Sequence, residues 1–142
     1  MRVVLDTNIL ISACWKPGGL EEQVIELGLA GRFAMAVSAV LWAEYLEVLA
    51  RPKFLKLKPR IDTLVARLEL QVVRIESHSR LTLASDPDDN IILECALDSG
   101  ANYIITGNLK HYPLDWPVAR IVNARQFFDQ TGYCSFVASA EP

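Results

Sequence analysis

The sequence predicts a three-layer α/β/α fold, in which a central parallel sheet of about five strands lies between helices. Two observations support this prediction. Short apolar runs rich in β-forming residues alternate along the chain with longer amphipathic segments, and strands joined through helices form parallel sheets with right-handed crossovers. The chain has 142 residues, of which 51% are hydrophobic and 22% charged, as is typical of one globular domain.

The apolar runs are the predicted strands. The first, residues 3–5, is apolar throughout, as expected for a central strand that is covered on both faces. It ends at Asp6, and ligands of open α/β sheets bind at the carboxyl ends of the strands. An acidic residue is therefore expected at the functional edge of the sheet. The other predicted strands are residues 33–37, 72–75, 103–106 and 120–122.

Helices are predicted between the strands, and polar residues, glycine and proline mark their ends. Ser38 is the expected N-cap of a helix that ends before Pro52, because a residue preceding proline avoids helical geometry. Another helix follows the sequence Asp86-Pro87-Asp88-Asp89 and ends at Gly100. The remaining helices are residues 7–13, 20–30, 61–70 and 124–130, with an exposed loop at 15–19 and a basic connector at 51–59. One domain, residues 1–130, and a loosely docked tail, residues 131–142, are predicted.

Cysteine and histidine usage excludes two kinds of site. Cys14, Cys95 and Cys134 have no paired spacing and are odd in number, which argues against a disulfide framework. We expect them to be small buried residues. With only two histidines and no Cys/His cluster, a zinc site is not predicted, so a bound metal would need oxygen ligands.

The chain is expected to stay in the cytoplasm. No apolar run is long enough to span a bilayer, and the apolar run before Asp6 is too short for a signal peptide. The net charge of −3 does not by itself favour a nucleic-acid partner. The charges are segregated, however, with basic residues concentrated at 51–60 and acidic residues at 86–89.

Two candidate sites follow predicted strands. Asp6 ends the first, and Thr106-Gly107-Asn108 ends the fourth with a hydroxyl, a glycine and an amide. Each also has a purely structural explanation, since an aspartate can cap the next helix and such a tripeptide is common in turns. Their shared position at the carboxyl ends of strands favours a functional role.

Two further candidate acids come from helices. Glu44 lies beside an apolar stripe that includes Leu41 and Val48, so its carboxylate needs either a metal or an arginine partner. At the start of the later helix, capping accounts for Asp86 and for a capping-box role of Asp89. Capping does not explain why Asp89 lies on the same helix face as Ile92. That face is apolar and packs on the sheet, so the Asp89 carboxylate is expected to turn toward the sheet.

If Asp6, Glu44 and Asp89 converge on one crevice, their carboxylates repel one another by a few kcal/mol at about 5 Å and an effective dielectric of about 20. A divalent cation relieves this repulsion, and Mg²⁺ or Mn²⁺ prefers oxygen ligands. Such a cation makes bound water acidic enough to attack a phosphodiester and neutralises the leaving oxygen. This pattern predicts nuclease chemistry.

These motifs resemble the PIN domain, a family of metal-dependent nucleases that includes VapC-like toxins of toxin–antitoxin pairs. The resemblance extends from residue 3 to about residue 128. It rests on Val4-Leu5-Asp6-Thr7-Asn8, on Ser38 with Glu44, on Asp86-Pro87-Asp88-Asp89-Asn90-Ile91 and on Ile105-Thr106-Gly107-Asn108. It implies that the first and fourth strands are adjacent, which would bring the four candidate places to one switch point.

The resemblance also implies roles for individual residues. Asp6, Glu44 and Asp89 are expected to be catalytic and to hold Mg²⁺ or Mn²⁺. Asp86 is similar to an additional acid of one branch of the family. Asn108 is expected to be a metal ligand, but many members carry aspartate there, which leaves a one-metal or substrate-assisted mechanism open. The polar residues expected to support metal-bound water are Thr7, Asn8 and Thr106.

The function predicted is a metal-dependent endoribonuclease, the toxin of a type II pair. Lys16, Arg51 and Lys53 are expected to position the RNA backbone, whose phosphates carry no sequence information. The resemblance further implies an antitoxin partner, which can place a basic side chain against the acidic site. Self-association through the early helices, as a homodimer or a larger oligomer, is also expected.

Three alternatives differ in class. The first is a PIN-like protein that binds nucleic acid without cutting it. The second is a phosphoacceptor receiver domain, which would be phosphorylated on Asp6. Receivers need a lysine at the end of the last strand, whereas this chain reads Arg120-Ile121-Val122-Asn123. The third, a dinucleotide-binding oxidoreductase, lacks its glycine-rich turn after the first strand.

Overall fold

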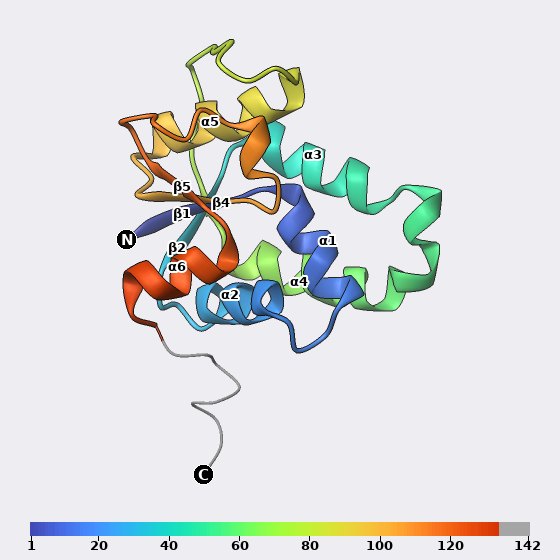
Figure 1. The fold of residues 1–142 in the computed structure, drawn as a ribbon. Helices are drawn as coiled ribbons and strands as arrows, with labels where there is room; N and C mark the ends of the chain where they lie inside the picture. The colour runs from blue at the N-terminus through green and yellow to red at the C-terminus, as the bar shows by residue number, and fades with distance from the viewer. Residues whose placement is uncertain (134–142) are drawn as a thin grey trace.

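The computed structural model describes residues 1–133, so Cys134 and most of the predicted tail lie outside the described residues. A five-stranded parallel sheet separates two groups of helices, which confirms the predicted three-layer α/β/α fold (Figure 1). The strands are β1 (Arg2–Leu5), β2 (Ala34–Val37), β3 (Val73–Arg74), β4 (Tyr103–Ile105) and β5 (Arg120–Val122).

The strand order is β3-β2-β1-β4-β5, so the chain reverses its direction of winding between β1 and β4. The expected adjacency of the first and fourth strands is confirmed: Val3, Val4 and Leu5 pair with Tyr103, Ile104 and Ile105. Such a reversal leaves a crevice at the carboxyl ends of the two strands. A receiver domain has the order 2-1-3-4-5, so that alternative is wrong.

The helices are α1 (Thr7–Trp15), α2 (Leu20–Leu29), α3 (Ala39–Leu49), α4 (Lys58–Gln71), α5 (Pro87–Ser99) and α6 (Ala124–Thr131), with short 3₁₀ helices η1 (Pro52–Leu57) and η2 (Leu109–His111). In Figure 1, α5 lies on one face of the sheet and α2, α4 and α6 lie on the other. Val3 and Val4 are fully buried between these layers, as a central strand requires. No helix in residues 1–133 combines the length and apolarity that a bilayer span would need.

Local signals placed most helix ends correctly. The Ser38 side chain accepts a hydrogen bond from Leu41 N, and Asp86 accepts one from Asp88 N. Gly100 ends α5 with a φ of 67°, a conformation that side chains other than glycine disfavour. Cys14 and Cys95 are buried, as predicted, and burial raises the pKa of the Cys95 thiol to about 11.

Two predicted elements differ in extent from those observed. The basic connector at residues 51–59 contains η1 over most of its length, and α4 begins at Lys58 and not at residue 61. Pro52 and Pro59 lie in the first turns of these helices, where a missing N–H costs no hydrogen bond. The third strand, predicted at residues 72–75, is only two residues long, and both residues are exposed because β3 lies at the edge of the sheet.

The connector from β3 to α5 is fastened by Asp98. Its carboxylate accepts hydrogen bonds from the Ser77 hydroxyl and from the backbone N–H groups of His78 and Ser79, at 2.8 to 2.9 Å, as well as from the Ser79 hydroxyl. These bonds, mainly those from Ser79, lower the pKa of Asp98 to about 2. These bonds form a clasp that ties the first part of the connector to the carboxyl end of α5.

The clasp predicts a pH dependence. An acid whose pKa is lowered by folding stabilises the fold above its unfolded pKa, and the stabilisation is lost as pH falls from about 4 to about 2. Over that range we expect the melting temperature of the wild type to fall more steeply than that of Asp98→Asn, measured by circular dichroism. The exposed-acid variant Asp129→Asn should follow the wild type. Parallel curves for the wild type and Asp98→Asn would contradict the clasp.

Candidate active site

The carboxyl ends of β1 and β4 border a crevice of about 220 Å³, which α1, α3 and the start of α5 complete. Most predicted site residues meet there. The lining includes Asp6, Thr7, Asn8, Glu44, Arg51, Asp86, Asp89 and Asn108, together with Asp88 and His111, which were not among the predicted site residues. Lys16 and Lys53 are exposed and lie outside this lining.

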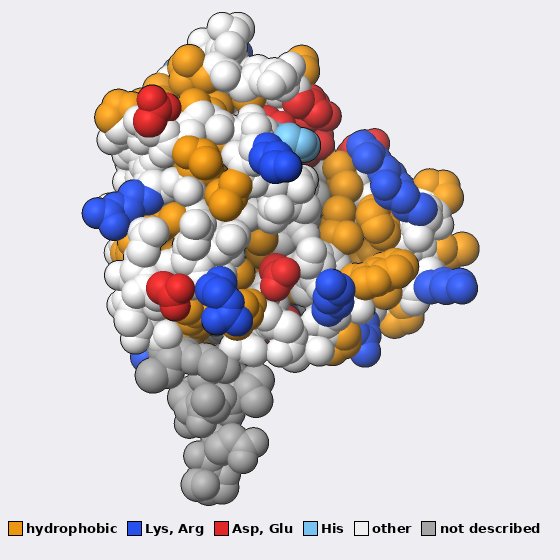
Figure 2. Space-filling model, in the orientation of Figure 1, with side chains coloured by type: hydrophobic (Ala, Val, Ile, Leu, Met, Phe, Trp, Pro, Cys, Tyr) orange, Lys and Arg blue, Asp and Glu red, His pale blue; other side chains and the backbone are white. Residues whose placement is uncertain are grey.

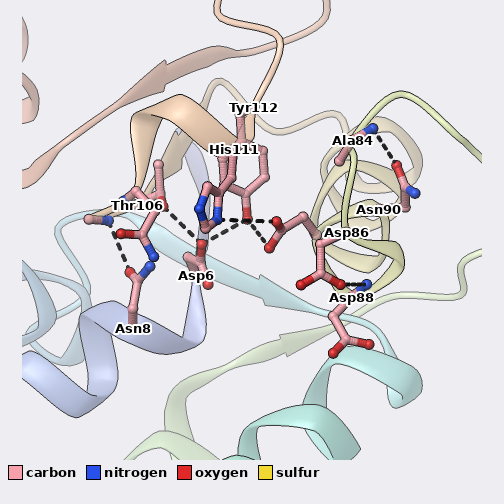
Figure 3. Close-up of polar contacts among 12 residues, drawn as sticks. Asp6, Asn8, Ala84, Asp86, Asp88, Asn90, Thr106, His111 and Tyr112 are labelled. Carbon is pink, nitrogen blue, oxygen red and sulfur yellow. Dashed lines mark hydrogen bonds and ion pairs between the residues drawn. The ribbon is translucent and has the colours of Figure 1, made fainter.

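Asp6 is buried and held by two hydroxyl groups (Figure 3). Its Oδ2 atom accepts hydrogen bonds from Thr106 Oγ1 at 2.8 Å and from the Tyr112 hydroxyl at 2.7 Å. Although Asp6 occupies the N-cap position of α1, its side chain makes no capping hydrogen bond, so the capping explanation is wrong. Asp6 Oδ1 accepts no hydrogen bond from residues 1–133, which leaves one carboxylate oxygen for a ligand.

The loop after β4 is tied to the start of α1. Thr106 Oγ1, which donates to Asp6, also accepts a hydrogen bond from Asn108 N at 3.0 Å. Asn8 Oδ1 accepts one from Gly107 N at 2.9 Å (Figure 3). Asn8 and Thr106 therefore hold the backbone and the Asp6 carboxylate in place, which explains why a polar tripeptide ends a buried strand.

Asp89 comes from the first turn of α5 and turns toward Asp6, not toward the helix N-terminus. Its Oδ1 atom accepts from the Tyr112 hydroxyl at 3.3 Å, so Tyr112 bridges the two acids. The proposed capping-box role of Asp89 is wrong, because Oδ1 accepts from Tyr112 and Oδ2 has no partner, so neither oxygen accepts from the backbone N–H of Asp86. Burial first, then the negative charges of Asp6 and Asp86, raise the pKa of the Asp89 carboxyl.

One oxygen of Asp89 lacks a partner. Asp89 Oδ2 is buried and forms no hydrogen bond within the described part of the chain; the imidazole of His111 lies beside it, with Nδ1 3.6 Å away. A buried carboxylate oxygen without a donor is costly and uncommon in a structural role. This atom points to a ligand that the protein chain itself does not supply.

Glu44 reaches the same crevice from α3 and is half-buried. Burial, followed by the charge of Asp88, raises the pKa of its carboxyl. The alternative that an arginine pairs with Glu44 is wrong for the described residues, because the neighbouring Arg51 forms its ion pair with Glu47 at 3.0 Å. Glu44 thus lies among other acids and forms no ion pair with the one arginine of the crevice, Arg51.

The crevice fits a divalent cation by its chemistry, although the acids do not form a compact cage. No group of three acidic, cysteine or histidine side chains among residues 1–133 is close enough to surround an ion directly. The carboxylate oxygens that lack partners suit Mg²⁺ or Mn²⁺, which bind through one or two carboxylates and keep several waters. Asp6 and Asp89 are the pair closest to such an arrangement, since one hydroxyl contacts both.

Sequence reasoning missed Tyr112, which is the centre of the hydrogen-bond network. The tyrosine lies seven residues beyond the end of β4, and η2 turns the chain back over the crevice. Burial and the charges of Asp6 and Asp89 raise the pKa of its hydroxyl, so it stays protonated and can donate. The only sequence signal was its place in the loop that follows Thr106-Gly107-Asn108.

Replacing Tyr112 by Phe should lower the free energy of unfolding by about 1–3 kcal/mol, because buried carboxylates lose a donor. The pKa of Asp89 should rise further, since the Tyr112 hydrogen bond lowers it. Urea denaturation and a carboxyl NMR titration measure the two effects. Tyr103→Phe is the matched control, because the Tyr103 hydroxyl contacts Gln130 outside the crevice. Equal stability and an unchanged Asp89 pKa in Tyr112→Phe would exclude the bridge.

Comparisons with known proteins agree with this fold. A family model described as the PIN domain matches residues 2–110. Among solved structures, a chain of VapBC2 from Rickettsia felis, bound to a promoter DNA fragment, has a TM-score of 0.59 at 21% identity, covering 87% of this chain and 98% of that one. A chain of DNA-bound VapBC from Salmonella typhimurium has a TM-score of 0.57 at 18% identity, with the same coverage of 87% and 98%. At these identities the likeness shows a shared fold. No curated protein matches the sequence.

Proposed function

The chain belongs to the PIN domain family, and from this premise we propose that it is a metal-dependent endoribonuclease that acts as the toxin of a type II toxin–antitoxin pair. The observation that carries the proposal is the gathering of Asp6, Glu44 and Asp89 in one crevice, with Asp89 Oδ2 buried and without a donor. Within residues 1–133 no lysine or arginine forms an ion pair with any of these three acids, and the one contact of this kind is that of His111 Nδ1 with Asp89 Oδ2 at 3.6 Å.

Asp6 and Asp89 would hold Mg²⁺ or Mn²⁺ most directly, and Glu44, Asp86 and Asn108 line the same crevice as further ligands, direct or through water. A cation bound there makes water more acidic and neutralises charge on the phosphoryl and leaving oxygens. Asp88 adds negative charge at the rim, which favours a cation over an anion.

Residues in and behind the crevice orient the acids. Thr106 and Tyr112 occupy Asp6 Oδ2, so the remaining oxygen, Oδ1, is the one presented to a ligand. Asn8 holds the loop that carries Thr106 and Asn108. Thr7 lines the crevice and is proposed to support metal-bound water.

RNA is proposed to approach across the acidic crevice. Arg51 lines it and is the basic residue of the predicted set that is best placed to contact a phosphate. Lys16 and Lys53 would have to act at a distance, and the Lys53 ammonium lies over the Phe54 ring, 5.2 Å from its centroid. Lys16 and Lys53 are therefore proposed to contact parts of the RNA that lie outside the crevice.

The toxin assignment is supported by the shared fold with chains from two VapBC assemblies. We propose an antitoxin partner that blocks the crevice with a basic side chain, action in the cytoplasm, and self-association through the early helices. The alternative of a PIN-like protein that binds RNA without cutting it predicts the same binding but no metal-dependent product.

The test is cleavage of a labelled single-stranded RNA and a DNA of the same sequence after treatment with chelator and after addition of Mn²⁺. The wild type should cut RNA only with metal, and Asp89→Asn should not cut it. Asp129→Asn, which removes an exposed acid from α6, is the matched control and should cut normally. Cleavage that persists in chelator, or that is equal in wild type and Asp89→Asn, would exclude the proposed mechanism. RNA binding without cleavage under all conditions would favour the binding protein.

A further inference from the structure

A second hollow, of about 410 Å³, lies beside the acidic crevice at the carboxyl ends of β4 and β5. Asn108 and His111 line both hollows and therefore form the wall between them. The complete lining is Gly107, Asn108, Leu109, Lys110, His111 and Asn123. A ligand that extends out of the acidic crevice over this wall enters the second hollow directly.

The second hollow differs from the crevice in its charge. No carboxylate lines it, whereas Asp6, Glu44, Asp86, Asp88 and Asp89 line the crevice. Lys110 and His111 are exposed, and Lys110 forms no ion pair with any residue from 1 to 133. The side-chain oxygen Oδ1 of Asn123 caps α6 by accepting from Gln126 N at 2.8 Å, which leaves the side-chain NH₂ group as a donor. The lining is thus basic and rich in donors.

The opposite rim of the crevice offers less uncompensated positive charge. Arg51 lies there, but Glu47 on the same helix pairs with it at 3.0 Å. His111 lies between the two hollows, with Nδ1 3.6 Å from Asp89 Oδ2. Figure 2 shows a histidine and a basic side chain side by side next to a cluster of acidic side chains. A polyanion that has one phosphate at the crevice therefore meets unpaired positive charge on the side of η2.

We propose, building on the nuclease function proposed above, that this second hollow binds the sugar-phosphate backbone of the nucleotide next to the scissile bond of single-stranded RNA. Lys110 contacts the phosphate, and the amide groups of Asn108 and Asn123 donate to phosphate or sugar oxygens. His111 separates this nucleotide from the one at the acids. The contacts are to the backbone, so this subsite fixes the register of the strand and not its sequence.

The experiment measures binding without cleavage. A short fluorescent single-stranded RNA is titrated with full-length protein in chelator over a range of salt concentrations, and fluorescence anisotropy gives the affinity. Lys110→Gln should reduce the slope of log K against log[salt] by about 0.7, which is a loss of about fivefold in affinity at about 0.1 M salt. Arg32→Gln is the matched control, because Arg32 is exposed at the amino end of β2, and it should behave as the wild type.

A second measurement does not depend on variants. RNA that carries 4-thiouridine should crosslink, on irradiation, to peptides that contain residues 107–111. An unchanged affinity and salt slope in Lys110→Gln, or crosslinks confined to η1 and α4, would overturn the subsite. Because binding is measured in chelator, a wild type that binds in this way but never cuts RNA overturns the nuclease and not the subsite. If the wild type cuts RNA but Lys110→Gln binds RNA as the wild type does, the subsite is overturned and the nuclease function is not.

Discussion

Replacing Asp6 by Asn should slow metal-dependent RNA cleavage by about a hundredfold or more while leaving the protein folded. Electrostatic stabilisation by a bound metal is worth several kcal/mol in the transition state, and each 1.36 kcal/mol corresponds to a factor of about ten in rate. Asparagine keeps an oxygen that can accept from Thr106 and Tyr112, so the hydrogen bonds of the buried site survive. Only the negative charge that a cation requires is lost.

The same substitution should leave the free energy of unfolding at pH 7 unchanged or raise it. The charge of Asp6 raises the pKa of Asp89, and an acid whose pKa is raised by folding destabilises the fold once it is ionised. Removing Asp6 relieves that cost at neutral pH, and the gain should disappear below about pH 4, where Asp89 is protonated in both states.

RNA cleavage with Mn²⁺ measures the effect of Asp6→Asn on activity. Urea denaturation at pH 7 and pH 3.5 measures its effect on stability, and Asp129→Asn is the control for both. Loss of activity together with retained stability identifies a residue kept for function and not for folding. If Asp6→Asn unfolds the protein, or cuts RNA at the wild-type rate, Asp6 is a structural residue and the proposed site is wrong.

Replacing Phe127 by Ala should lower the free energy of unfolding by about 3–5 kcal/mol. Phe127 is fully buried at the centre of an aromatic cluster, with ring centroids 5.4 Å from Phe33 and 5.2 Å from Tyr103 and a stacked contact with Tyr133 at 6.0 Å. Removing the ring leaves a cavity that these large neighbours cannot fill without moving the sheet.

This substitution also tests the domain boundary. Phe127 lies on α6, beyond residues 2–110 that the family model matches, so a large effect would show that the folding unit includes α6, as the predicted domain of residues 1–130 requires. Urea denaturation followed by circular dichroism gives the change. Leu70→Ala, at a position 89% exposed on α4, should change stability by less than about 0.5 kcal/mol. A loss below about 1 kcal/mol for Phe127→Ala would mean that α6 is only loosely attached.

The sequence was most informative where a local rule determines a local structure. An uninterrupted apolar run placed β1 in the centre of the sheet, and Ser38, Asp86 and Gly100 marked helix ends through their own hydrogen bonds or backbone angles. It was least informative for residues 51–59 and for β3. A basic, proline-containing segment looks like a loop although its prolines suit first turns, and an apolar run cannot reveal that its strand lies at an edge.

By itself the sequence placed Asp6 at the end of a strand and turned Glu44 and Asp89 toward the apolar faces of their helices, because strand ends and helix faces follow from residue periodicity; that these acids share one crevice was implied by the resemblance to the PIN domain. Only the tertiary structure decided what each acid meets there. The Tyr112 bridge, the unpartnered Asp89 Oδ2 and the pairing of Arg51 with Glu47 in place of Glu44 depend on how η2, α3 and α5 pack around one crevice. The physical reason is that hydrogen bonds and charge repulsion act over a few ångströms, whereas Asp6 and Tyr112 are 106 residues apart in the chain.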